Sequence, residues 1–152
     1  MTDELTQATA RYVDQIFGSG SGESHVRFLD RIENSALREI VHRYHSFEAD
    51  TSQLSLEENY LIGLCVLCAQ GRNATAAMFA KTLLALGVSK SKVLEAVARL
   101  AMWIGGLPAV EASFVIQKAI REYELDPKAA LSVWFPAADD PQKARPAPEG
   151  RR

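Results

Sequence analysis

The stretch NATAAMFAKTLLALGVSKSKVLEAVARLAMWIGGLPAVEASFVIQKAIREYE, residues 73–124, decides the fold of this chain. Its first part is rich in Ala and Leu and stops at Gly87, and Ser89 then opens a segment whose apolar residues recur every three or four positions. Gly105 interrupts this pattern, and Pro108 stands where the first turn of a helix tolerates proline. We therefore predict three consecutive helices, over residues 74–86, 90–104 and 107–124.

The rest of the chain has the same helical period. We expect the Gly- and Ser-rich residues 18–22 to form a loop, and Ser24 to be the N-cap of a long helix. Ser55 and Glu58 form a capping-box pattern, and Gly71 ends the helix that they open. The sequence thus predicts an all-α domain of about six helices, over residues 2–17, 24–47, 55–71, 74–86, 90–104 and 107–124, with a short helical turn at 126–134.

Composition and charge indicate one ordinary domain over residues 1–136. Of the 152 residues, 17 are Lys or Arg and 19 are Asp or Glu, without blocks of like charge, which argues against nucleic acid as a partner. The longest uncharged apolar run, residues 60–69, is far shorter than the roughly 20 residues of a membrane-spanning helix. We expect a cytoplasmic protein with no membrane partner and no cofactor. Residues 137–152 are rich in proline and charge and predict a disordered tail.

The order helix, Gly-Val-Ser, helix with an internal Glu95, aromatic-x-Gly-x-Pro-Ala, helix resembles the carboxymuconolactone decarboxylase family, which includes the AhpD-type peroxidases. The matching positions are Gly87 to Ser89, Glu95, and the segment from Trp103 to Ala109. The resemblance covers about a third of the chain. It implies an AhpD-like helical domain that assembles into a homo-oligomer, a trimer or a hexamer.

The family's usual reactive positions hold other residues in this chain. The peroxidase branch carries Cys-x-x-Cys followed four residues later by His, and counting back from Gly87 places Arg72, Thr75 and Phe79 there. The acidic residue that this branch keeps upstream falls on Tyr60. The decarboxylase branch also uses a His in this helix, and the phenyl ring of Phe79 cannot transfer a proton.

Cys65 and Cys68 have the Cys-x-x-Cys spacing of thiol oxidoreductases. A reactive thiolate needs a helix N-terminus or a neighbouring cation, whereas Cys65 is expected about ten residues into a helix and is flanked by Leu64 and Val66. An apolar setting raises the pKa of a thiol. We therefore favour buried structural thiols over a redox pair.

The histidines offer a second set of candidate residues. Glu39, His42 and His45 stand three residues apart, and Glu-x-x-His is half of a carboxylate-bridged di-metal motif. The second half is absent from the sequence, so we expect no metal. Neighbouring arginines indicate a solvated helix face, and His25 is interpreted as a first-turn surface residue.

A ligand pocket is expected beside Phe79, where the resemblance places one. It would assemble Tyr60, Cys68, Phe79, Met102 and Trp103, with Arg72 at the rim as the anchor for a carboxylate. A small aromatic or acidic ligand fits this description. The helix over residues 74–86 is apolar on nearly all sides, which predicts that its second face packs against another subunit.

Two functional hypotheses follow. In the first, the chain keeps the family's scaffold without its standard catalytic residues and serves as a small-molecule-binding or assembly module. In the second it is an enzyme. That enzyme is either a decarboxylase or lactone-processing variant that uses Tyr60, Glu57 or Glu58 and Arg72, or a thiol peroxidase that uses Cys65 and Cys68.

Overall fold

The computed structural model describes residues 3–49 and 53–132, and all regular structure in this part of the chain is helical. The all-α class predicted from the sequence is therefore confirmed. No helix in these ranges has the length and apolar character needed to cross a membrane. The predicted tail, residues 137–152, and Trp134 lie outside the described residues. The helices are α1 (Asp3–Phe17), α2 (Ser21–Leu29), α3 (Ser35–Ala49), α4 (Leu56–Ala69), α5 (Asn73–Ala85), α6 (Lys90–Arg99), α7 (Ala101–Ile104), α8 (Gly106–Leu125) and α9 (Pro127–Ser132).

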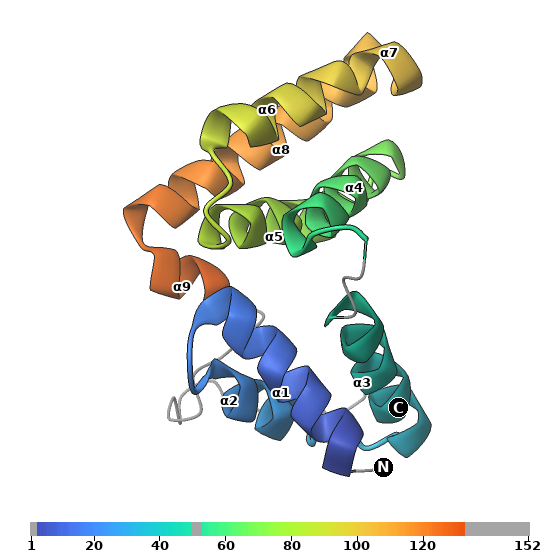
Figure 1. Ribbon diagram of the computed structural model, residues 1–152. Helices are drawn as coiled ribbons and strands as arrows, with labels where there is room; N and C mark the ends of the chain where they lie inside the picture. Colours follow the sequence, from blue (N-terminus) through green and yellow to red (C-terminus); the bar gives the residue numbers. More distant parts are fainter. Residues whose placement is uncertain (1–2, 50–52, 133–152) are drawn as a thin grey trace, which may run out of the picture.

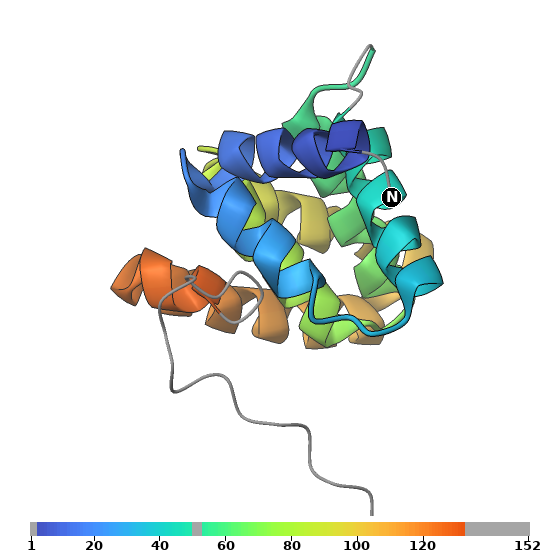
Figure 2. The same cartoon turned by 90° about the horizontal axis from the view of Figure 1, so that it is seen from below.

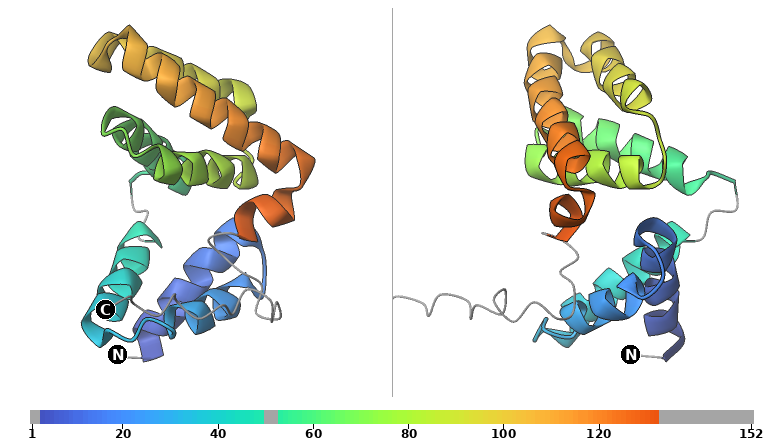
Figure 3. Two further views of the ribbon diagram at one scale, coloured as in Figure 1. Left: turned by 180° about the vertical axis from the view of Figure 1, so that it is seen from behind. Right: turned by 90° about the vertical axis from the view of Figure 1, so that its left-hand side faces the viewer.

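The helices form three groups along the long direction of Figure 1. The pair α4 and α5 lies in the middle, α6 to α8 lie on one side of it, and α1 to α3 lie on the other (Figures 1 and 3). Seen from below, α1 to α3 stand in front of the remaining helices (Figure 2). The short α9 follows α8 and packs against both α8 and α5.

One hydrophobic cluster runs through all three groups. Tyr12, Val13 and Ile16 on α1 pack into the same cluster as residues of the middle pair and of α6 and α8. Burial of such side chains stabilises a fold by about 1.5–3 kcal/mol each. The fully buried members that join α4, α5, α6 and α8 are Leu64, Ala80, Leu83, Val93, Val97, Ile116 and Ile120.

Helix α5 packs on α4 and on α8, and its buried positions include Ala76, Ala80 and Leu83. Its Lys81 reaches across to Glu122 on α8, with the ammonium nitrogen 2.6 Å from the carboxylate. Part of the apolar surface of this helix is therefore covered within the chain, while Met78 and Phe79 are only partly buried. The contact with another subunit stays a prediction.

Most of the predicted helix ends are observed. Ser55 and Glu58 form both hydrogen bonds of the capping box at the start of α4, and Gly71 follows its end with a left-handed φ of 68°. Ser89 accepts a hydrogen bond from the backbone N–H of Lys92 and caps α6. Helix α5 begins at Asn73, one residue before the start predicted from the sequence.

The long helix predicted over residues 24–47 is wrong, since α2 ends at Leu29 and α3 begins at Ser35. The side chain of Asn34 accepts a hydrogen bond from the backbone N–H of Leu37 and so caps the new helix. Ser24 lies inside α2 and is not an N-cap. The segment predicted over residues 90–104 is likewise divided, into α6 and α7.

The predicted glycine loop is shorter than its composition suggests. Gly22 belongs to α2 and is buried, and a Cβ at this position would overlap the backbone carbonyl of Ala10 on α1. This glycine therefore sets the close approach of α1 and α2 rather than the flexibility of a linker.

Candidate functional site

An apolar pocket of about 470 Å³ lies between α3, α4 and α5. Its wall includes four side chains that are also exposed at the surface, so the pocket opens to solvent. Concave, mostly apolar pockets of this size with few polar groups are typical of small-molecule sites. The lining residues are Tyr44, Phe47, Glu48, Asn59, Ile62, Gly63, Val66, Leu67, Thr75, Met78 and Phe79.

Gly63 and Phe79 shape the wall between α4 and α5. A Cβ at position 63 would overlap the ring of Phe79, so this ring lies directly on the α4 backbone. On its other side the Phe79 ring meets that of Tyr60, with the ring centroids 4.7 Å apart. Phe79, at the position where the resemblance implies a His, is therefore held by packing and lines an apolar wall.

Glu48 is the single carboxylate among the described residues that line the pocket. Its Oε2 accepts a hydrogen bond of 2.5 Å from the hydroxyl of Tyr12, and that hydroxyl lies 2.6 Å from the hydroxyl of Tyr60. Burial raises the pKa of Glu48, and hydrogen bonds from Tyr12 and Tyr44 act in the opposite direction. Burial likewise raises the pKa of Tyr44, to about 12, so this phenol stays protonated at neutral pH.

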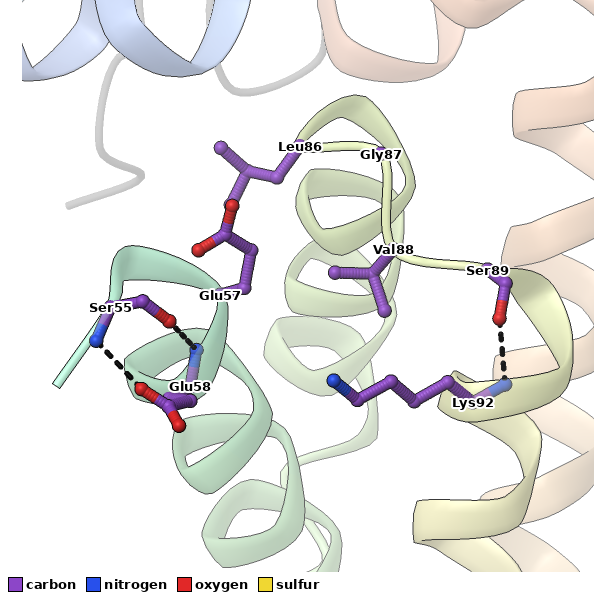
Figure 4. A pocket seen from close by; sticks show the side chains of 8 residues that line it. All are labelled: Ser55, Glu57, Glu58, Leu86, Gly87, Val88, Ser89 and Lys92. Atoms are coloured by element: carbon purple, nitrogen blue, oxygen red, sulfur yellow. Dashed lines mark hydrogen bonds between the residues drawn. The ribbon is translucent and has the colours of Figure 1, made fainter.

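The carboxylates of Glu57 and Glu58, two candidate catalytic residues, lie elsewhere. They line a shallow hollow of about 570 Å³ between the start of α4 and the α5–α6 junction (Figure 4). Glu58 accepts a hydrogen bond of 2.8 Å from the backbone N–H of Ser55, and this bond lowers the pKa of its carboxyl. Its role as a helix cap leaves it poorly suited to accept a proton in catalysis.

The residues proposed for a lactone-processing enzyme are not brought together. Arg72 is exposed and precedes α5, next to the C-terminal end of α4, while Glu57 and Glu58 occupy the first turn of α4. The length of α4 separates these ends by roughly 16 Å at 1.5 Å per residue. Tyr60 is buried, with its hydroxyl bound to Tyr12.

The two thiols have the apolar surroundings predicted from the sequence. Cys65 is half-buried and Cys68 is buried, and both are free. Burial raises the pKa of both thiols, that of Cys68 to about 11. Neither is a thiolate at neutral pH, which is the form that attacks a peroxide.

Met102 and Trp103 do not line the pocket beside Phe79. Both lie on α7 and are among the most exposed apolar side chains of the described residues, at 86% and 84%. The pocket is closed by α3 in the place where the resemblance implied the aromatic-Gly-Pro segment. Arg72 does not belong to its lining either, so the pocket has no guanidinium anchor for a carboxylate.

The expectation of solvated histidines is wrong. His25 and His42 are 5% and 0% exposed, and His42 Nδ1 lies 2.8 Å from the hydroxyl of Thr9. His45 stacks on Tyr12 with ring centroids 5.3 Å apart, and its ring lies edge-on to that of His25 at 5.0 Å. The histidine-bearing face of α3 packs on α1 and α2, while the partly exposed Glu39 pairs with Arg43 at 2.7 Å. Among the described residues no group of three potential ligands is arranged to hold a metal ion.

The sequence interpretation missed Tyr44 and Glu48, which supply the polar side of the pocket. Together with Phe47 they stand three and four positions apart on α3, so they share one helix face. That spacing was available in the sequence. In the predicted single helix over residues 24–47, these positions belong to one continuous apolar stripe. The break between α2 and α3 turns this face toward α4.

Comparison with known proteins gave no match. No family model, no curated protein and no solved structure is significantly similar to the chain.

Proposed function

We propose that this protein is a small-molecule-binding module whose ligand occupies the pocket between α3, α4 and α5. The observation that carries the proposal is an open apolar cavity of about 470 Å³ with one buried carboxyl group in its wall. Apolar walls provide binding energy in proportion to the area that they remove from water, and a single polar group orients the ligand. The ligand is therefore a small molecule with an aromatic or aliphatic body.

We also propose that the chain is related to the carboxymuconolactone decarboxylase family and keeps the scaffold of that family without its standard catalytic residues. The support for this relationship is the succession of α5, the Gly87 turn, α6 and α7, the Gly105 turn and α8. The replacement of the family's His by Phe79, which packs on Gly63 and Tyr60, supports binding over catalysis.

The enzymatic alternatives receive less support from the geometry. A thiol peroxidase needs a thiolate, and burial raises the pKa of both thiols. A lactone-processing enzyme needs its acid, base and anion-binding groups in one place. Of the four candidate residues, Glu58 caps a helix, Tyr60 forms a buried hydrogen bond and Arg72 is exposed at a helix start. Glu57 lines the separate hollow at the start of α4.

A second surface supports assembly as an additional role. Met102 and Trp103 on α7 and Leu107, Val110 and Phe114 on α8 are each at least half exposed, and we call these five residues the α7–α8 face. Large apolar side chains that are exposed together in this way are typical of surfaces that contact another protein. We include in the proposal that copies of this chain associate through this face, with the trimer or hexamer that the resemblance implies.

Titration with 1-octanol, followed by amide chemical shifts, tests the ligand site. We expect saturable binding that perturbs α3, α4 and α5, and a change in affinity of about fivefold or more in Phe79→Ala, because this ring forms part of the wall. Arg72→Ala serves as the matched control, since Arg72 is exposed and does not line the pocket. Shifts confined to α7 and α8, or equal affinities in both variants, would place the ligand elsewhere.

A further inference from the structure

The carboxyl group of Glu48 in the pocket wall is not balanced by a cation of the described residues. Within the described ranges none of the ion pairs involves Glu48, and the groups that act on its carboxyl are the hydroxyls of Tyr12 and Tyr44. Burial opposes its ionised form, and two neutral donors compensate only part of that cost. A ligand that brings its own positive charge would supply the missing partner.

The aromatic side chains of the lining favour the same kind of ligand. Tyr44, Phe47 and Phe79 contribute to one pocket with Glu48, and the first two lie four and one positions before it on α3. The face of an aromatic ring attracts a cation, and quaternary ammonium groups are bound by cages of this composition. No lysine or arginine is among the lining residues, so no positive charge of the wall repels a bound cation.

We infer that the ligand is an organic ammonium ion with an apolar body, an inference that rests on the proposed binding function. The charge of this ion is placed between the Glu48 carboxylate and the rings of Tyr44 and Phe47. The apolar body then extends along the wall formed by α4 and α5, over Ile62 and Met78. A carboxylate ligand is excluded from this pocket by repulsion from Glu48.

The test compares three probes of equal chain length by calorimetric titration at pH 7.5: octyltrimethylammonium, 1-octanol and octanoate. We expect the cation to bind at least tenfold more tightly than the alcohol, and octanoate to bind more weakly than either. Glu48→Gln keeps the size of the side chain and removes the charge. This variant should lose most of the preference for the cation, measured as the ratio of its affinities for octyltrimethylammonium and for 1-octanol.

Two further variants separate charge from shape. Glu57→Gln removes one negative charge from α4 at a residue of the other hollow, and we expect it to leave the preference for the cation intact. Phe47→Leu acts on a side chain that is 77% exposed, so the fold should tolerate it. It should weaken binding of the cation more than binding of octanol.

A measurement on the wild type covers the case in which Glu48→Gln does not fold. Octyltrimethylammonium keeps its charge at every pH, so any pH dependence of its affinity comes from the protein. Because ionised Glu48 attracts the cation, affinity for the cation should fall as the pH is lowered through the pKa of this carboxyl, and affinity for octanol should not.

The outcomes distinguish the two proposals. Octanol binding in the pocket with equal or weaker binding of the cation overturns the ammonium assignment and leaves the binding module standing. An unchanged preference for the cation in Glu48→Gln also overturns the assignment. Absence of binding by all three probes overturns both.

Discussion

The hydroxyl oxygens of Tyr12 and Tyr60 lie 2.6 Å apart and connect α1 directly to α4. Tyr12 uses its proton to bond Glu48 on α3, so Tyr60 donates to Tyr12. This chain of hydrogen bonds links three helices that are distant in sequence. It also fixes the carboxyl group of the pocket from behind, which couples the stability of the fold to the geometry of the site.

Tyr12→Phe should therefore destabilise the protein more than Tyr60→Phe. Loss of the Tyr12 hydroxyl removes the bonds to both partners and leaves the partly buried carboxyl of Glu48 with one donor fewer and the buried phenol of Tyr60 unsatisfied, at a cost of about 2–3 kcal/mol. Loss of the Tyr60 hydroxyl removes one bond, at a cost of about 1 kcal/mol. Urea unfolding of both variants and of the double variant measures these values. Equal losses of unfolding free energy in the two single variants, or a loss in the double variant that equals the sum of the single losses, would show that the network is not coupled as described.

The buried histidines should make the protein less stable as the pH falls below neutrality. Burial, with the neighbouring histidines, lowers the pKa of His25 to about 3 and that of His45 to about 4, against about 6.5 in an unfolded chain. Between about pH 6.5 and pH 4 the unfolded state thus binds more protons, and stability rises with pH across this window. The expected loss at pH 5 is about 2 kcal/mol for each such histidine.

Other titratable groups near these histidines also affect how the unfolding free energy depends on pH. His42 contributes in the same direction, because burial lowers its pKa as well, with Asp30 opposing and Arg38 adding to the effect. Glu48 contributes the opposite sign above its unfolded pKa, because its folded pKa is raised. Urea unfolding at pH 7.5, 6 and 5 measures the net slope. His25→Leu should reduce the slope of unfolding free energy against pH by the equivalent of about one proton. Identical slopes in this variant and in the wild type would contradict this account.

Gly22→Ala should be among the most destabilising single substitutions in the N-terminal half. The added methyl group meets the backbone of Ala10, which cannot move aside as a side chain could, so α1 and α2 must separate. We expect a loss of about 2–3 kcal/mol. Gly106→Ala is the matched control, because nothing lies near a Cβ at that helical position. A loss below about 0.5 kcal/mol for Gly22→Ala, measured by thermal or urea unfolding, would contradict the packing described.

Cys65 and Cys68 should react slowly with a disulfide reagent at pH 7 and faster as the pH rises. Burial raises the pKa of both thiols, and the higher value, about 11, belongs to Cys68. Single Cys→Ser variants identify which thiol reacts, and the remaining Cys68 in Cys65→Ser should be the slower one. We also expect no dithiol-dependent peroxide reduction above background. Turnover that Cys68→Ser abolishes would restore the peroxidase alternative.

The helices were predictable where local chemistry determines them. The Ser55 capping box, the Gly71 and Gly87 turns and the Ser89 cap use only neighbouring residues, and the structure contains all of them. The break between α2 and α3 was not found, because apolar residues continue at helical spacing across it. The cap at Asn34, followed by Leu37, was the signal that the periodicity concealed.

The site was less predictable because tertiary packing decides it. Phe79 was recognised as a pocket residue, but its neighbours come from α3, whose orientation depends on how α1 and α2 fold back. His42 has charged neighbours in the sequence and is nevertheless buried, since the helix turns it toward Thr9 while Arg43 faces outward. Charge in an adjacent position is a poor indicator of exposure in a helix, because neighbouring residues point about 100° apart.

The α7–α8 face leads to the last prediction, which concerns assembly. Leu107, Val110 and Phe114 follow one another on α8 at spacings of three and four, so they form a single stripe that is exposed to solvent in one copy of the chain, and Trp103 on the neighbouring α7 is exposed as well. Sedimentation at micromolar concentration should therefore detect a homo-oligomer.

Phe114→Lys places a charge in this stripe and should shift the protein toward the monomer by at least tenfold in dissociation constant. Phe114 is 67% exposed in one copy, so the substitution should leave the monomer's thermal unfolding within a few degrees of the wild type. Phe47→Lys is the matched control, since it adds the same charge to another exposed aromatic residue, at the rim of the α3–α4–α5 pocket. A wild-type monomer at these concentrations, or equal dissociation in both variants, would show that copies do not associate through α7 and α8.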